Sequence, residues 1–302
     1  MHDSRLLLTL MSTIMAVAVG CADIATTPGG SGFLEANEAV VSAEVSGRVL
    51  SMAFDEGTRV SRGDTLLVID TTGLSLRLAA AVAGLTALRE ELAASEIKVR
   101  QAEEIERHAK SERDRISRLF EAGTAAKRTL DEVEHQFRQA ALATQMARAA
   151  LNVLEARIES TSADIELIRK QLSDCHPAAP FAGRITQKYV EVGELLSPGR
   201  PIARVSRLDT LWIKVYLNAG DFARTKIGSP ATVDTESGGA KYPGTVVWAS
   251  DEAEFTPKNV QTKDARANLV YAVKVTVANS DQRLKIGMPV FVTVQTYELP
   301  DD

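Results

Sequence analysis

Apolar residues recur every seven positions through a long central part of the chain. From Leu130 to Leu172, one such series is followed three positions later by a second series, over six heptads. This a/d pattern is typical of a helix that packs an apolar seam against another helix. The a positions are Leu130, Phe137, Thr144, Leu151, Ile158, Ile165 and Leu172, and the d positions are Val133, Ala140, Ala147, Leu154, Thr161 and Ile168.

A second amphipathic stretch precedes this one. Its a positions are Leu78, Leu85, Leu92 and Val99, and its d positions are Ala81, Leu88, Ser95 and Ala102. Beyond Ala102 the apolar residues shift to Ile105, Ala109, Ile116 and Leu119, which we interpret as a stutter in the heptad register. The charged residues between them predict a solvated face.

The two stretches are joined at Gly123. No proline occurs from Leu74 to Leu172, so a long helix can run on either side of this glycine. Gly123 is a candidate helix stop, and Thr124 a candidate start of the next helix. We therefore predict an antiparallel coiled-coil hairpin over residues 71–175.

The segments that flank the hairpin repeat one another. Glu44–Ile69 aligns with Pro180–Val205 without a gap at an offset of 136 residues. Each copy predicts three short strands, with bends at glycines that favour positive φ. One copy is too small to bury a core, so the two copies should pair in one flattened barrel or sandwich. The matched pairs include Gly47 and Gly183, Arg48 and Arg184, Gly57 and Gly193, Ser61 and Ser197, and Gly63 and Gly199.

This repeat resembles the two halves of a lipoyl or biotinyl carrier domain. In that family, the lysine that carries the cofactor lies in the turn between the halves, which is where the hairpin stands in this chain. No carrier tripeptide occurs in the sequence, so we expect no cofactor. The predicted halves are residues 33–70 and 176–206.

The last third of the chain is rich in strands. Runs of β-branched residues separated by Gly, Pro, Asn and Asp predict five or six strands, which would close into a small β-barrel over residues 207–297, before a tail at 298–302. Trp212 and Trp248 lie in these runs, and core packing is favoured for them over ligand stacking. The polar segment 254–266 is a long loop and a candidate interface. The predicted fold class is thus α+β and multidomain.

The chain begins with a targeting segment. Arg5 precedes an apolar run from Leu6 to Val19, which is too short to span a bilayer. We predict a signal peptide at residues 1–20. The end of this run, Ala18-Val19-Gly20-Cys21, resembles a bacterial lipobox and implies lipidation of Cys21; an ordinary secretory signal cleaved elsewhere is the alternative. A small, polar segment at 21–32 is then expected to act as a flexible tether.

Composition and motifs exclude several classes of function. The net charge of −5 offers no basic field for nucleic acid. No nucleophile–base pair, phosphate-binding glycine loop or metal-ligand spacing occurs, so we expect neither an enzyme nor a metal site. Cys175 is the second of only two cysteines, and a filler role at a helix end is favoured for it.

The order of half-module, hairpin, half-module and barrel behind a lipobox resembles the HlyD-type periplasmic adaptors, also called membrane fusion proteins. The segments 40–70, 179–206 and 284–294 resemble the two lipoyl halves and the barrel-closing strand of that family. The segment 254–277 resembles adaptors of ABC-type exporters more than those of RND pumps. The resemblance implies an inner-membrane transporter, a TolC-like outer-membrane channel and a hexamer of this chain as partners, in the periplasm of a Gram-negative bacterium.

In this family the hairpin tip docks on the channel through an arginine, a leucine four residues later, and a serine or threonine seven residues beyond that. Arg115 and Leu119 match this motif, but the third position is Ala126, with Thr124 nearby. The resemblance therefore implies a docking tip that comprises these residues and Gly123. Three alternatives stay open: the same adaptor role on an RND pump, a hairpin that only dimerises, and a structural lipoprotein without a transport role.

Overall fold

The computed structural model of this 302-residue chain describes residues 28–235, 240–255 and 269–296. It divides into one compact unit at Ala39–Val205 and a second unit formed by the segments on either side. Helices and separate antiparallel strands make up the two units, which confirms the predicted α+β class. The strands β1 (Gly29–Ser42) and β7 (Pro201–Asn218) each run through both units.

The two repeat copies pair as equivalent, exchangeable halves in the first unit. Its strands are β2 (Gly47–Met52), β3 (Arg59–Val60), β4 (Leu67–Ile69), β5 (Gly183–Lys188) and β6 (Leu195–Leu196). Arg48 of β2 faces Leu195 of β6, and Arg59 of β3 faces Arg184 of β5. The offset of 136 residues converts the first pair into the second. Each copy therefore completes the other.

Backbone hydrogen bonds show the same relation between the two copies. The Gly57 N–H donates to the Ile185 carbonyl oxygen at 2.8 Å, and the Gly193 N–H donates to the Val49 carbonyl oxygen at 2.9 Å. Both glycines have φ near +90°, as the bends predicted. The matched apolar positions of the two copies meet in one buried core: Val49 and Ile185, Val60 and Leu196, Leu66 and Ile202, and Ile69 and Val205.

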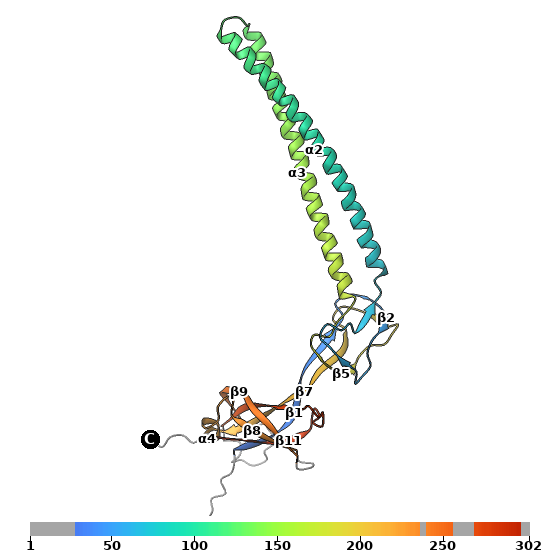
Figure 1. Ribbon diagram of the computed structural model, residues 1–302, viewed down its shortest axis with the longest axis vertical. Helices are drawn as coiled ribbons and strands as arrows, with labels where there is room; N and C mark the ends of the chain where they lie inside the picture. Colours follow the sequence, from blue (N-terminus) through green and yellow to red (C-terminus); the bar gives the residue numbers. More distant parts are fainter. Residues whose placement is uncertain (1–27, 236–239, 256–268, 297–302) are drawn as a thin grey trace, which may run out of the picture. The chain divides into compact units, whose positions relative to one another are not determined.

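The second unit is built on a closed ring of six strands (Figure 1). The ring order is β1–β11–β8–β9–β10–β7, and β7 pairs with β1 again. Its core is almost entirely aliphatic, with Val, Leu and Ile side chains from every strand. The remaining members of this unit are α4 (Ala219–Ala223), β8 (Pro230–Thr235), β9 (Lys241–Phe255), β10 (Leu269–Ala278) and β11 (Pro289–Val294).

The predicted tether is wrong for Gly29–Gly32, which begin β1 and pair with β11. The glycines there serve close packing and not flexibility. A Cβ atom on Gly32 would lie 2.7 Å from Ile213 Cγ2 and 2.7 Å from the Lys214 carbonyl oxygen. A side chain at this position would displace β7, so a glycine-rich sequence is compatible with a strand.

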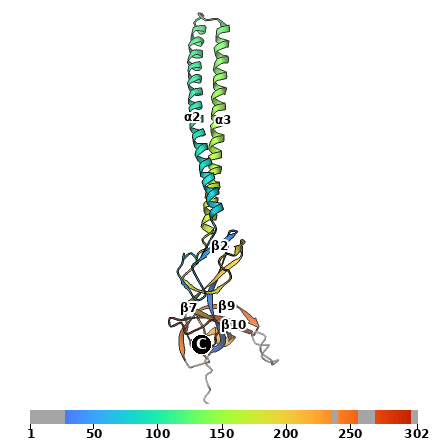
Figure 2. The ribbon, with the colours of Figure 1, turned by 90° about the vertical axis from the view of Figure 1, so that its right-hand side faces the viewer.

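Two long helices interrupt the first unit between the repeat copies. The helix α2 spans Thr72–Glu121 and α3 spans Lys127–Asp174, with 50 and 48 residues. They lie side by side along their length in both views (Figures 1 and 2). At about 1.5 Å per residue, each helix is roughly 70–75 Å long. Arg148 of α3 donates to Glu103 of α2 at 2.7 Å and connects the two midway.

The predicted seam of α3 coincides with its buried face, because every one of its a and d positions is buried or half-buried. The seam of α2 follows the prediction as far as Ala102 and then differs. Of the four residues predicted beyond Ala102, Ala109 and Ile116 are half-buried, as predicted, but Ile105 and Leu119 are 56% and 42% exposed, so the shift of register is wrong. Half-buried Glu106 and Arg113 take the next a positions and keep the heptad register.

Arg113 can occupy a seam position because its long side chain is only partly polar. Its guanidinium lies 4.5 Å from the centre of the Phe137 ring on α3, and it also bonds Asp114. The charge is therefore stacked and paired at the seam, and the apolar residue Ile105 is left on the outside.

Candidate functional site

The tip of the hairpin is a tight, fully hydrogen-bonded turn. Gly123 has a φ of +75° and directly follows the C-cap Ala122. The Gly123 N–H donates to the Phe120 carbonyl oxygen, and the Thr124 N–H donates to the Leu119 carbonyl oxygen, both at 2.9 Å. This is the Schellman motif, which favours glycine at the left-handed position. The prediction that Gly123 ends the first helix is confirmed.

Thr124 does not start the second helix, contrary to the prediction. Its hydroxyl donates to the Leu119 carbonyl oxygen at 2.9 Å and so caps the end of α2. The N-cap of α3 is Ala126, whose side chain cannot accept the usual capping bond. A threonine hydroxyl can donate to a carbonyl oxygen at the end of one helix or accept from an N–H at the start of the next, so the residue type alone did not decide between the two helix ends.

Arg115 and Leu119 lie one turn apart on the same face of α2. The Arg115 guanidinium donates to both carboxylate oxygens of Glu112, at 3.1 Å and 2.5 Å. This pairing lowers the pKa of Glu112 and raises the pKa of Arg115, so both groups are charged in the physiological range. Their mutual attraction orders the arginine without burying it, since its side chain is 62% exposed.

Apolar surface lies next to this charge. Leu119 is 42% exposed and Phe120 is 37% exposed, although both stand in the last turn of a helix. Phe120 was not among the predicted site residues. The tip thus combines an oriented guanidinium, two exposed apolar side chains and a rigid turn. An oriented charge beside exposed apolar side chains is a combination that suits contact with another protein.

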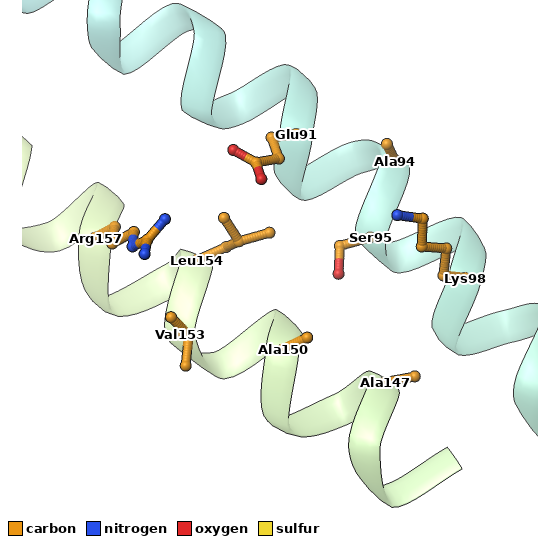
Figure 3. A pocket seen from close by; sticks show the side chains of 9 residues that line it. All are labelled: Glu91, Ala94, Ser95, Lys98, Ala147, Ala150, Val153, Leu154 and Arg157. Atoms are coloured by element: carbon orange, nitrogen blue, oxygen red, sulfur yellow. The ribbon is translucent and has the colours of Figure 1, made fainter. Parts of the chain in front are cut away.

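A shallow groove runs between the helices farther down the hairpin, with a volume of about 360 Å³. Small side chains at facing positions open it: Ala94 and Ser95 on α2, and Ala147 and Ala150 on α3 (Figure 3). Glu91 and Arg157 approach it from opposite helices in the same view. The groove is therefore a weakly packed flank of the helix pair and not an enclosed ligand site.

The two tryptophans were predicted to pack in a core, and this is wrong for both. Trp248 is 43% exposed on β9, and Trp212 is only partly buried on β7. Lys274 of β10 lies between them in the sheet, with its Nζ 3.8 Å from the centre of the Trp212 ring. The alternation of β7 places Leu211 and Ile213 inward, so Trp212 faces outward. The alternation of side chains along the run at Leu211, Trp212 and Ile213 could have predicted this from the sequence.

Several predicted features lie outside the described residues. They are the signal peptide at 1–20, the lipidation site Cys21, residues 22–27 of the tether, most of the 254–266 loop and the tail. Among the described helices, none is long and apolar enough to cross a membrane. No cluster of three or more potential metal ligands is found in the part of the chain that the structure describes.

The fold thus consists of a β module that is split by a helical pair with an exposed tip and, in the other unit, a ring of strands. The barrel-sandwich hybrid domain of RND membrane fusion proteins (RND MFP) matches residues 37–206, more than half of the 302 residues. The chain belongs to this family of membrane fusion proteins, or periplasmic adaptors.

Individual relatives agree with this assignment. The UPF0194 membrane protein in the asrC 5' region of Acidithiobacillus ferridurans is 34% identical over 139 residues, which cover 46% of this chain and 41% of that relative. A UPF0194 membrane protein of Citrobacter koseri is 27% identical over 280 residues, 84% of each chain. The crystal structure of MacA from Actinobacillus actinomycetemcomitans has a TM-score of 0.64 at 20% identity, over 90% of this chain and 80% of that one, and so shares the fold.

Proposed function

We propose that this protein is the periplasmic adaptor of a tripartite export system, which connects an inner-membrane transporter with a TolC-like outer-membrane channel. The observation that carries the proposal is the insertion of two helices of about fifty residues between the halves of one β module. Such an insertion places both helix ends side by side and projects a rigid tip far from its base. The membership in the membrane fusion protein family supports the same role.

In this proposal the helix pair is the coiled-coil hairpin of the adaptor, and the ring of strands is its β-barrel. Cys21 carries the lipid that holds the chain at the inner membrane after removal of residues 1–20. The tip residues Arg115, Leu119, Gly123, Thr124 and Ala126 dock on the channel, with Phe120 beside them. Copies of the chain assemble in a ring, and a hexamer is the expected number.

The transporter is of the ABC type in the leading version of the proposal, because the segment 254–277 resembles adaptors of such exporters. An RND pump is the second candidate, favoured by the description of the matching family. The two versions differ in the protein that co-purifies with the adaptor: an ATPase with a GxxxxGK[ST] motif, or a pump with twelve spans and two large periplasmic loops.

A photo-crosslinker at the tip tests the docking role. Position 122 suits it better than position 123, because Ala122 is exposed with a φ of −77°, whereas the φ of +75° at Gly123 would strain any side chain. We expect capture of an outer-membrane channel from position 122 and none from exposed Glu159, about two thirds of the way along α3 from the tip. Arg115→Glu with Leu119→Ser should abolish the capture. Capture of the adaptor alone from position 122 would instead support a hairpin that only dimerises.

A further inference from the structure

Three apolar side chains are exposed where the chain enters the ring of strands. Phe33 of β1 is 63% exposed, Phe291 of β11 is 42% exposed, and Ile286 in the turn before β11 is 42% exposed. Their inward neighbours Leu34 and Val290 are fully buried, so the strand alternation fixes Phe33 and Phe291 on the outer face. We call Phe33, Ile286 and Phe291 the entry patch.

The entry patch is contiguous on the sheet. Phe291 faces Ser31, and Phe33 faces Pro289, so the two rings lie on a diagonal of adjacent strands, within reach of one another. Ile286 adjoins Gly287, whose N–H donates to the Leu34 carbonyl oxygen at 2.8 Å. Exposed Lys285 precedes it and adds a positive charge at the edge. Exposed aromatic and aliphatic side chains grouped in this way mark an interaction surface.

The length of the chain before β1 indicates what this surface meets. The Phe291 ring lies against Gly29, and the Pro28 carbonyl oxygen accepts a hydrogen bond from the Val294 N–H, so residues 28 and 29 lie beside the entry patch. Only residues 22–28 separate it from Cys21. Seven residues span at most about 25 Å. A lipid on Cys21 therefore keeps the entry patch within that distance of the bilayer.

We propose that the entry patch docks on the membrane surface in which the lipid of Cys21 is anchored, with Phe33, Phe291 and Ile286 inserted at the boundary of headgroups and acyl chains. The inference rests on the lipidation in the proposed function. Phenylalanine and aliphatic residues beside a lysine suit this boundary. Three side chains bind a bilayer weakly from solution, but the short tether makes their binding intramolecular and raises their effective concentration to the millimolar range.

An environment-sensitive dye at Ser31→Cys, which is opposite Phe291 and two residues before Phe33 on β1, tests the proposal. Cys175 is 1% exposed and Cys21 is acylated, so the new thiol is the one that reacts. The full chain, purified from membranes, is reconstituted in vesicles of phosphatidylethanolamine and phosphatidylglycerol that contain nitroxide-labelled lipid. We expect a blue shift and loss of most of the emission. The control label at Val247→Cys is also exposed, on β9, which is opposite β1 in the ring, and should keep its emission.

Phe33→Ser with Phe291→Ser should restore the emission at position 31. If mass spectrometry finds the acyl chains on Cys21 but the emission at position 31 is unchanged, the entry patch does not dock on the membrane. That result would leave the adaptor role intact. Equal quenching at positions 31 and 247, or a shift that depends on protein concentration without vesicles and so indicates a second copy, would also overturn the proposed docking. Unmodified Cys21 would refute the proposed anchor itself, and the inference with it.

Discussion

At the scale of single residues, the glycines of this chain have opposite effects at different positions. Gly32 has no room for a side chain beside Ile213 and Lys214, whereas a Cβ atom on Gly84 of α2 would meet no atom within 4 Å beyond the adjacent backbone of its own helix. We expect Gly32→Ala to destabilise the protein by about 1–3 kcal/mol, since β7 must shift. The control Gly84→Ala should stabilise it by about 0.5–1 kcal/mol, because alanine favours a helix. Urea denaturation measures both, and a neutral Gly32→Ala would show that β1 is not closely packed there.

Asp70 makes the stability at the start of α2 depend on pH. Its carboxylate accepts a hydrogen bond from the Thr72 N–H at 2.9 Å, and bonding to Thr72, with a smaller effect of Arg48, lowers its pKa below the ordinary value of 3.8. Because the folded pKa is the lower one, this contribution to stability is present above pH 3.8 and is lost as the pH falls through the folded pKa.

Melting temperatures of wild type and Asp70→Ala should therefore differ at neutral pH and converge in acid. The control Asp70→Asn keeps an acceptor oxygen but no charge, so its melting temperature should lie between the two at neutral pH. A difference between wild type and Asp70→Ala that persists below the folded pKa would contradict this account of the helix start.

At the scale of single elements, α3 carries a second apolar stripe on its outer flank, at positions other than the a and d residues that pack on α2. Leu142, Met146, Val153 and Leu167 are 59%, 73%, 53% and 58% exposed, and Ala149, Ala156, Ser160 and Ala163 continue the same row. The row has helical spacing and includes no charge over 26 residues. A helix face that contacts only water would carry charged or polar residues at these positions. The apolar row therefore supports the ring assembly in the proposed function.

The stripe yields a prediction about assembly. Met146→Glu with Val153→Glu should disperse oligomers of the adaptor to monomers, as measured by sedimentation, because two buried charges without partners disfavour the contact. The helix content should not change, since both side chains already face solvent in the single chain. Gln145→Glu with Asn152→Glu adds the same charges at exposed neighbouring positions and is the matched control. Intact oligomers of the first variant would exclude the stripe as an interface.

At the scale of the whole molecule, patterns within short segments of the sequence predicted the helices and the repeated half-modules, whereas pairing between distant segments was not predicted. The sequence directly predicted the repeat at an offset of 136, because the glycines and apolar positions recur within each copy. It likewise predicted the a/d series of α3, because each heptad contains the pattern. The sequence did not reveal that β1 joins the ring, because pairing between residues 29–33 and 289–293 has no local signature. The stutter was a wrong prediction for a different reason: apolarity alone ranked Ile105 above Glu106, and the stacking of Arg113 on Phe137 was not visible.

The split of the β module leads to the last prediction, that the hairpin can be removed without unfolding its base. The two ends of the insertion are bonded to each other below the helices: the Ile69 N–H donates to the Cys175 carbonyl oxygen at 2.9 Å, and the Leu66 N–H donates to the Pro177 carbonyl oxygen at 2.8 Å. A two-residue Asn-Gly turn suits such an antiparallel connection, so it can replace residues 72–174.

We expect the shortened chain to lose its helical circular dichroism signal, keep a cooperative thermal transition and no longer capture the outer-membrane channel. Its core still contains both repeat copies, since the buried pairs such as Val49 and Ile185 come from outside the hairpin. The matched control adds Ile185→Asp, which buries an unpaired carboxylate and should abolish the transition. If the shortened chain without that change also lacks a transition, the hairpin is required for the two halves to fold, and the β module is not an independent base onto which the helices were inserted.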